Sequence, residues 1–198
     1  MHTRCALVGM PGSGKSTVGR QLARRLGLPF VDLDQRLEQR LGTSIRAYFE
    51  QHGEPAFRDH EAALLSELAD TPGGMVLSTG GGAVLREDNR AALRRGFPHV
   101  MYLRASPEDI FKRVKHDRAR PLLQVADPLA RLRDLYRTRD PLYRDAAHYV
   151  IETGRPSVST LVNMIVMQLD LAAPGPGGQP GRNSDAPSGA GPGAKPVA

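Results

Sequence analysis

The stretch Gly9-Met10-Pro11-Gly12-Ser13-Gly14-Lys15-Ser16-Thr17 decides the fold of this chain. It matches the phosphate-loop pattern, which is Gly, any four residues, Gly, Lys, and then Ser or Thr. Glycines at this spacing let successive backbone N–H groups point at a polyphosphate with no Cβ in the way. The pattern assigns Lys15 to the β- and γ-phosphates and the Ser16 hydroxyl to Mg²⁺. The other predicted nucleotide contacts are Gly12, Ser13, Gly14 and Thr17.

The residues on either side of this loop have the patterns of a strand and a helix. Residues Arg4–Val8 form a short apolar run typical of a buried strand, and residues 17–26 predict a helix with Val18, Leu22 and Leu26 on one face. An ordinary Gly/Pro turn is the alternative interpretation of the loop. Because strand, loop and helix follow in the order that a phosphate loop requires, the sequence predicts binding of a nucleoside triphosphate.

Length and composition indicate one cytoplasmic domain. The chain has 198 residues, of which 40% are hydrophobic and 24% are charged, as in ordinary globular proteins. We expect no membrane span, because no apolar run approaches the required length, and no signal peptide, because the first strand starts within a few residues. The single cysteine, Cys5, cannot form an internal disulfide, and the six histidines lack the spacing of metal ligands.

The net charge of +6 and the isoelectric point of about 9.9 raise the possibility of nucleic-acid binding. The basic residues are spread along the chain, however, and the aromatic residues are five Phe and five Tyr with no Trp. A stacking platform interleaved with basic residues is therefore missing. We predict no nucleic-acid partner.

Strand and helix patterns alternate along the chain, which predicts a parallel sheet covered on both faces. Strands are expected at Arg4–Val8, 30–31, Met75–Ser78, 99–103 and 149–151. Two insertions interrupt the alternation: a helical segment at about 34–62 and a charged, Pro-containing segment at about 115–127. Residues 174–198 are rich in Gly and Pro and are predicted to be a disordered tail. The folded domain is thus predicted to span residues 1–173.

Two aspartates follow the second predicted strand. Asp32 and Asp34 are separated by one residue, so an extended backbone places both on the same side. At the carboxyl edge of the sheet, one can hold Mg²⁺ while the other faces the phosphoryl acceptor. Since no acidic residue ends the third strand, Asp32 is the candidate for the metal. A pair of solvated loop acids is the alternative.

An arginine and a glycine run point to an anionic acceptor. Arg58 lies one helical turn before Glu61, which can orient its guanidinium for a carboxylate ligand. The alternative is a surface ion pair of little consequence. Three glycines, Gly80 to Gly82, follow the third strand and let the backbone approach a ligand closely. A plain flexible turn is the other interpretation of this run.

Together these motifs resemble those of the shikimate kinase family. The resemblance continues through Arg120-Pro121-Leu122-Leu123 and Arg139-Asp140-Pro141-Leu142-Tyr143, and it covers about residues 4–172 with the motifs in order. It implies an α/β fold of the P-loop, nucleoside-monophosphate-kinase-like class, with a five-stranded parallel sheet in the order 2-3-1-4-5. It also implies phosphorylation of the 3-hydroxyl of shikimate by ATP, with one Mg²⁺ per subunit, in a monomer.

The resemblance also implies roles for individual residues, carried over by position. Asp34 is the expected base and ligand of the acceptor hydroxyls, while Arg58, Gly81 and Arg139 are expected to hold the acid. Phe49 and Phe57 are expected to form walls of the acceptor pocket. For ATP, the expected residues are Arg113 along the adenine, Arg120 in a lid over the phosphates and as a catalytic group, and Arg155 in an adenine loop of variable length.

Two other functions are compatible with part of the pattern. A gluconate kinase shares the phosphate loop but is not expected to combine Arg58, the three glycines and Arg139. A non-catalytic nucleotide- or nucleic-acid-binding module predicts damage at catalytic positions, whereas Lys15, Ser16, Asp34 and Arg120 are all present. A shikimate kinase is the function that the sequence favours.

Overall fold

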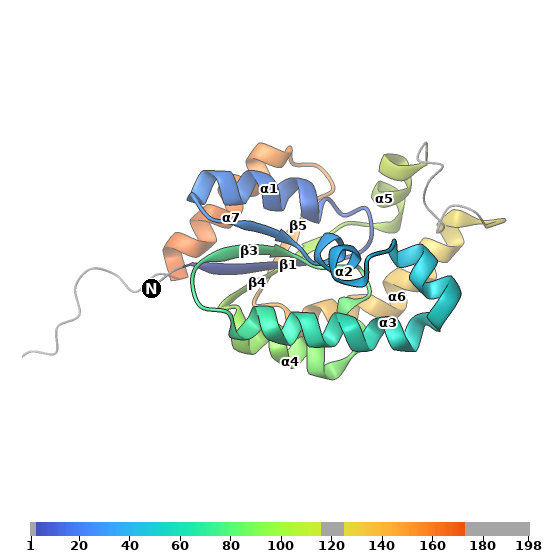
Figure 1. Cartoon of the computed structure of the whole chain (residues 1–198). Coiled ribbons are helices and arrows are strands. Elements are labelled where there is room, and N and C mark those ends of the chain that lie inside the picture. The colour runs from blue at the N-terminus through green and yellow to red at the C-terminus, as the bar shows by residue number, and fades with distance from the viewer. Residues whose placement is uncertain (1–2, 116–124, 173–198) are drawn as a thin grey trace, which may run out of the picture.

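A computed structural model describes residues 3–115 and 125–172 of the chain, which form a parallel sheet between two layers of helices (Figure 1). The sheet has five strands in the order β2-β3-β1-β4-β5. They are β1 (Arg4–Val8), β2 (Phe30–Asp32), β3 (Met75–Ser78), β4 (His99–Arg104) and β5 (Tyr149–Glu152). The predicted strands and the predicted order are confirmed.

The helices alternate with these strands. They are α1 (Lys15–Leu26), α2 (Leu33–Leu41), α3 (Ile45–Asp70), the 3₁₀ turn η1 (Ala83–Leu85), α4 (Glu87–Gly96), α5 (Pro107–Val114), α6 (Pro128–Ala146) and α7 (Val158–Ala172). In Figure 1, α1 and α7 lie above the sheet, whereas α3, α4 and α6 lie below it. This arrangement agrees with the prediction of a sheet covered on both faces.

Strand β1 shows why both faces must be covered. Its residues Cys5 and Leu7 belong to the apolar cluster under α1 and α7, while Ala6 and Val8 belong to the cluster over α3, α4 and α6. All four side chains are 0% exposed. Because successive strand residues point to opposite faces, a continuous apolar run such as this one is stable only between two helical layers.

The insertion predicted at about 34–62 comprises α2 and the first part of α3. Helix α3 is interrupted at Gly53, whose φ of 80° and ψ of 166° are not helical. Only glycine adopts such a conformation at low cost, so Gly53 separates an outer helical segment from one that packs on the sheet. Arg120, most of the predicted lid at about 115–127 and the predicted tail at 174–198 lie outside the described residues.

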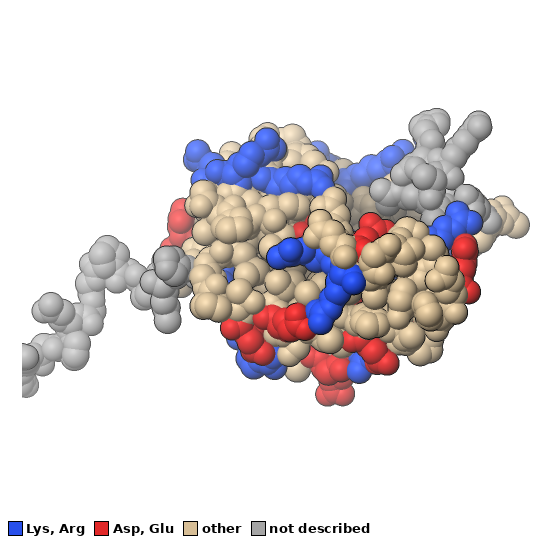
Figure 2. Space-filling view, viewed as in Figure 1, with Lys and Arg blue, Asp and Glu red and all other residues tan. Residues whose placement is uncertain are grey.

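The charged side chains are unevenly distributed over the face drawn in Figure 2. Lys and Arg gather along α1 at the top, and Asp and Glu gather over α3 and α4 below. Helix α1 carries the exposed residues Arg20, Arg24 and Arg25. Among residues 3–115 and 125–172, no helix is long and apolar enough to cross a membrane.

Candidate active site

A cleft of about 480 Å³ lies at the carboxyl ends of β1, β2 and β3. Parallel α/β sheets bind ligands at this edge. The cleft is lined by Pro11, Gly12, Gly14, Lys15, Ser16, Thr17, Asp32, Asp34, Thr79, Gly81, Arg113 and Val114. Phosphate-loop residues and both candidate aspartates thus face one space.

The phosphate loop leads directly into the N-terminus of α1. Gly12 and Gly14 have φ values of 83° and 97°, which glycine adopts without strain. Helix α1 has no acidic residue in its first turn, so its N–H groups and its dipole can face an anion. Lys15 is 7% exposed, and its Nζ donates to the carbonyl oxygens of Gly9 and Met10 at 2.9 and 3.0 Å. The lysine is therefore held in the curve of the loop.

Three oxygen-bearing side chains meet beside the loop. The Ser16 hydroxyl donates to Asp32 Oδ2 at 2.8 Å and lies 3.3 Å from the hydroxyl of Ser78, at the end of β3. Hard cations such as Mg²⁺ prefer oxygen ligands, and Mg²⁺ usually takes only one or two from the protein beside phosphates and water. The described residues contain no group of three or more His, Cys, Asp or Glu side chains arranged for a metal. The Ser16 and Asp32 oxygens match the one or two protein ligands that Mg²⁺ usually takes.

Asp34 lies two residues beyond Asp32, in the first turn of α2. Burial raises the pKa of its carboxyl above the ordinary value, the negative charge of Asp32 adds to this effect, and Lys15 and Arg58 oppose it. A carboxylate that is costly to keep ionised is a better proton acceptor than a solvated one. Asp34 therefore differs from a solvated loop acid, and its role as a general base stays a prediction.

Two carboxylates fix the guanidinium of Arg58. Its Nη1 donates to Glu61 Oε2 at 2.7 Å, and its Nε and Nη2 donate to Glu54 Oε1 at 3.1 and 2.8 Å. The Arg58 side chain is 16% exposed and that of Glu61 is 1% exposed, which excludes the surface ion pair. An arginine has five N–H donors, so these three hydrogen bonds leave two donors for another ligand. The predicted contact between Arg58 and Glu61 is confirmed.

Each glycine of the turn after β3 is approached by a different functional group. A Cβ on Gly80 would lie 2.6 Å from Asp34 Oδ1, and one on Gly81 would lie 2.6 Å from the ring of Pro11 in the phosphate loop. A Cβ on Gly82 would lie 2.6 Å from Nη1 and 2.7 Å from Cζ of Arg58. Real Cβ atoms do not come this close to other heavy atoms. An added side chain would collide with the ring of Pro11 at Gly81 and would displace the flexible ends of Asp34 and Arg58 at Gly80 and Gly82, which argues against a plain flexible turn.

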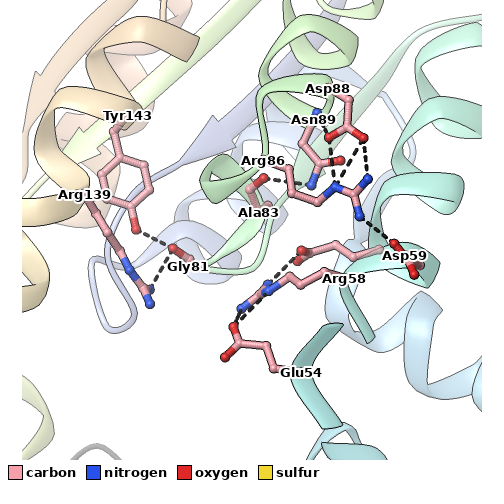
Figure 3. A network of polar contacts seen from close by, with 11 residues as sticks. Glu54, Arg58, Asp59, Gly81, Ala83, Arg86, Asp88, Asn89, Arg139 and Tyr143 are labelled. Atoms are coloured by element: carbon pink, nitrogen blue, oxygen red, sulfur yellow. Dashed lines mark hydrogen bonds and ion pairs between the residues drawn. The ribbon is translucent and has the colours of Figure 1, made fainter. Parts of the chain in front are cut away.

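The same turn is held from two sides by polar contacts (Figure 3). From α6, Arg139 Nη1 and the Tyr143 hydroxyl both donate to the Gly81 carbonyl oxygen, at 3.1 and 2.5 Å. From α4, the buried Asn89 donates its Nδ2 to the Ala83 carbonyl oxygen at 2.9 Å. Arg86 adds a link to Asp59 of α3 at 2.6 Å. Arg139 and Arg58 thus approach the turn from different helices.

Arg113 lies at the other end of the cleft. Its Nη1 is 3.5 Å from the carbonyl oxygen of Ser13 and 3.5 Å from the Thr153 hydroxyl, and its Nη2 donates to the Thr153 carbonyl oxygen. The residue therefore joins the phosphate loop to the segment after β5. This position agrees with the expected place of a nucleotide base, although the role of Arg113 stays a prediction.

The residues that line the cleft do not include six of the described residues predicted for the site, which are Ser13, Arg58, Arg139, Phe49, Phe57 and Arg155. Phe49 and Phe57 pack on each other with ring centroids 4.7 Å apart, and Phe57 is only 2% exposed because it belongs to the core below the sheet. Arg155 is exposed in the segment between β5 and α7. The roles of Phe49, Phe57 and Arg155 stay predictions.

Three further residues take part in the site without having been assigned a role from the sequence: Ser78, Glu54 and Tyr143. The sequence does contain signals for two of them. Glu54 lies four residues before Arg58, and Tyr143 lies four residues after Arg139, which places each pair on one helical face. Ser78 has no such signal, because its contact with Ser16 depends on the pairing of β1 with β3.

The fold and the site define a P-loop kinase of the nucleoside-monophosphate-kinase-like class, in which Asp34 lines the cleft and Arg58 approaches the glycine turn beside it. A sequence profile described as shikimate kinase matches residues 11–170. A shikimate kinase of Paracidovorax citrulli is 59% identical over 170 residues, which are 84% of this chain and 91% of the relative. The chain belongs to the shikimate kinase family.

Solved structures agree with this assignment. The shikimate kinase from Acinetobacter baumannii in complex with shikimate matches with a TM-score of 0.81 and 41% identity, over 88% of this chain and 97% of that one. A gluconokinase from Sinorhizobium meliloti matches with a TM-score of 0.59 and 21% identity, over 86% of this chain and 93% of that one. The second likeness extends to the fold alone, so the gluconate kinase alternative is not supported.

The raised pKa of Asp34 gives a prediction for stability. At low pH the carboxyl is neutral in the folded and the unfolded chain, whereas above its raised folded-state pKa the folded chain must keep a buried charge. Stability associated with Asp34 is therefore lost as pH rises through that pKa. Asp34→Asn removes the charge, so its melting temperature should exceed that of the wild type at pH 7.

The measurement is thermal unfolding of both proteins across a pH series, and the advantage of Asp34→Asn should shrink as the pH falls below the ordinary Asp value of about 3.9. Asp170→Asn, on an exposed position of α7, is the control. A lower melting temperature for Asp34→Asn than for the wild type at pH 7 would show that the ionised carboxylate is stabilised in the fold.

Gly82 gives a second prediction. Its φ of −99° and ψ of −4° suit alanine, and the three heavy atoms nearest to an added Cβ all belong to the guanidinium of Arg58. We expect Gly82→Ala to fold and to raise the KM for the acceptor about tenfold by displacing Arg58, while the KM for ATP stays unchanged. Steady-state kinetics tests this. In an Arg58→Ala background the added effect of Gly82→Ala should vanish, and its persistence there would contradict the displacement of Arg58.

Proposed function

We propose that this chain transfers the γ-phosphoryl group of ATP to the 3-hydroxyl of shikimate, giving shikimate 3-phosphate and ADP for aromatic amino-acid biosynthesis. Membership of the shikimate kinase family supports this reaction. The observation that carries the proposal is the Gly80–Gly82 turn, because the acceptor residues Asp34 and Arg58 and the phosphate loop all contact it. A donor phosphate and an acceptor hydroxyl bound to these groups would be neighbours.

At the donor end, the phosphate loop binds the triphosphate of ATP through Gly12, Ser13, Gly14, Ser16 and Thr17. Lys15 neutralises charge on the transferring phosphoryl group, and Arg113 lies along the adenine. Phosphoryl transfer depends chiefly on alignment and charge neutralisation, which these groups supply. Arg120 and Arg155, expected from the family pattern to contact ATP, complete this part of the proposal.

We assign one Mg²⁺ per subunit to Ser16 and Asp32, with Ser78 as their neighbour. When bound, the ion supplies a positive charge that bridges phosphate oxygens and lowers the cost of the charge that develops on them. The support in this chain is the oxygen donor set, in which the Ser16 hydroxyl is 2.8 Å from Asp32 Oδ2.

At the acceptor end, Arg58 and Arg139 bind the carboxylate of shikimate, and the backbone of Gly81 lies against it. Among the described residues, the amides of Gly81 and Gly82 donate to no protein acceptor, so they can contribute to anion binding. Asp34 binds the hydroxyls and accepts the proton of the attacking one. Phe49 and Phe57 restrict the pocket on the side of α3. Two arginines and an aspartate match an anionic polyol in charge and in hydrogen-bonding type.

The predictions of cytoplasmic location, a monomer and no nucleic-acid partner accompany this function. Separate measurements address them: analytical ultracentrifugation for the monomer, and salt-dependent binding of DNA or RNA for the nucleic acid.

The test of the proposed function is ADP release by the purified chain with ATP and Mg²⁺ and either shikimate, gluconate or no acceptor. We expect turnover with shikimate only. Lys15→Ala should lower kcat by about 10²–10³, the usual loss when a charge-stabilising group is removed. Arg24→Ala, on an exposed position of α1, is the control for the lost positive charge. Turnover with gluconate alone, or equal turnover of Lys15→Ala and the wild type, would contradict the proposal.

The two acceptor arginines give a more selective prediction. Arg58→Lys or Arg139→Lys keeps the positive charge but loses the planar fork that pairs with a carboxylate. We expect the KM for shikimate to rise about tenfold, which corresponds to about 1.4 kcal/mol, while the KM for ATP changes little. Arg137→Lys is the matched control, because Arg137 is an exposed residue of the same helix. A change in the KM for ATP alone would show that these arginines serve the nucleotide.

A further inference from the structure

Helix α6 contacts the glycine turn through two donors that share one acceptor. The Gly81 carbonyl oxygen receives the Tyr143 hydroxyl at 2.5 Å and Arg139 Nη1 at 3.1 Å (Figure 3). A carbonyl oxygen has two lone pairs, so both hydrogen bonds can form together. Tyr143 is fully buried, and nothing in the proposed reaction requires its hydroxyl to contact a substrate.

We propose that Tyr143 is a positioning residue of the acceptor site, which holds the Gly81 carbonyl toward α6 and thereby orients the glycine turn and Arg139 for the acceptor. This inference rests on the proposed function.

The planarity of the peptide bond explains how one hydrogen bond can orient the turn. The carbonyl of Gly81 and the N–H of Gly82 belong to the same peptide unit, and in a trans peptide they point in opposite directions. No cis peptide bond occurs among the described residues. A carbonyl held toward α6 therefore aims the Gly82 N–H away from α6. The glycines on both sides leave the backbone torsions nearly unrestricted. This hydrogen bond therefore restricts the orientation of a peptide that no side chain restricts.

The position of the Tyr143 hydroxyl is itself fixed by the core. Its ring stacks on that of Tyr102 of β4, with centroids 5.0 Å apart and an angle of 29° between the planes. Burial raises the pKa of Tyr143 to about 12, so the hydroxyl keeps its proton and remains a donor at neutral pH. The Tyr143 hydroxyl is therefore positioned by α6 and by its packing on β4, and not by a loop.

Arg139 and Tyr143 have different roles once an acceptor binds. Arg139 is half-buried and can turn its fork toward a carboxylate, giving up part of its contact with Gly81. Tyr143 donates to Gly81 from the buried core, and its hydroxyl also interacts with the Arg139 side chain, so it can keep the turn in place while Arg139 engages the ligand. Their spacing of four residues on α6 couples the arginine to this support.

Tyr143→Phe tests the inference, because it keeps the ring and its stacking and removes only the hydroxyl. We expect the KM for shikimate to rise about three- to tenfold, in the range of one neutral hydrogen bond, with the KM for ATP unchanged. The kcat should change less than about twofold, since an interaction with equal effect on ground and transition states alters KM alone. Calorimetric titration of the enzyme with shikimate should show the same loss of affinity.

Tyr102→Phe is the matched control. Tyr102 is equally buried and forms the other half of the stacked pair, and its hydroxyl donates to Asp140 Oδ1 at 2.8 Å, away from Gly81. Both variants remove one hydroxyl from the core, so both should lower the melting temperature by similar amounts. Only Tyr143→Phe should raise the KM for shikimate. Equal KM values in the two variants would overturn the positioning role and leave a purely structural one.

A double-mutant cycle of Tyr143→Phe with Arg139→Lys separates a positioning role from a general loss of structural stability. Since Tyr143 and Arg139 act on one carbonyl, the combined loss of shikimate affinity should be smaller than the product of the single losses. Strictly multiplicative losses would contradict the inference. Failure of the proposed function is visible separately, because the wild type would then show no turnover and no binding with shikimate before any variant is compared.

Discussion

Close backbone contact at Gly80, Gly81 and Gly82 is the constraint on which the arrangement of this site depends. Asp34, the ring of Pro11 and the guanidinium of Arg58 each occupy space that a Cβ would need. Three functional groups from three different segments can therefore converge on about ten ångströms of chain, roughly the length of three extended residues. A side chain at any of these positions would separate at least one group from the others. The absence of side chains here is thus a positive feature of the site.

The electrostatics of the site follow from this crowding. Asp34 and Glu61 both lie beside Gly80, and burial raises the pKa of each carboxyl, while Arg58 opposes the rise in both cases. Glu61 Oε2 is bound by Arg58, but Glu61 Oε1 is buried without a hydrogen-bond partner among the described residues. Buried, partly satisfied polar groups are unfavourable for folding and are concentrated at functional sites. The core on both sides of the sheet supplies the stability that permits such a cluster.

The parts of the site that could be predicted from the sequence are those encoded by local spacing. The phosphate loop is contiguous, and the pair of Arg58 and Glu61 needs only the three-residue step of a helix. The family pattern then supplied the strand order and the candidate status of Arg139. Contacts between segments could not be read in this way. The approach of Ser78 to Ser16 requires the register of β1 and β3, and the placement of Phe57 in the core requires the packing of α3. The kink at Gly53 could likewise not be predicted from the sequence, because helical patterns continue on both sides of it.

The contact between Pro11 and Gly81 shows how such a fold can set the distance between donor and acceptor without a dedicated side chain. Pro11 occupies one of the unrestricted positions of the phosphate-loop pattern, yet its ring lies against the glycine turn that Asp34, Arg58 and Arg139 approach. Both partners are stiff: proline has a fixed φ, and the turn is anchored by Tyr143, Arg139 and Asn89. Phosphoryl transfer gains much of its rate from holding the reacting groups in line at contact distance. A rigid contact between two backbones is well suited to that purpose, because its length does not depend on side-chain rotamers.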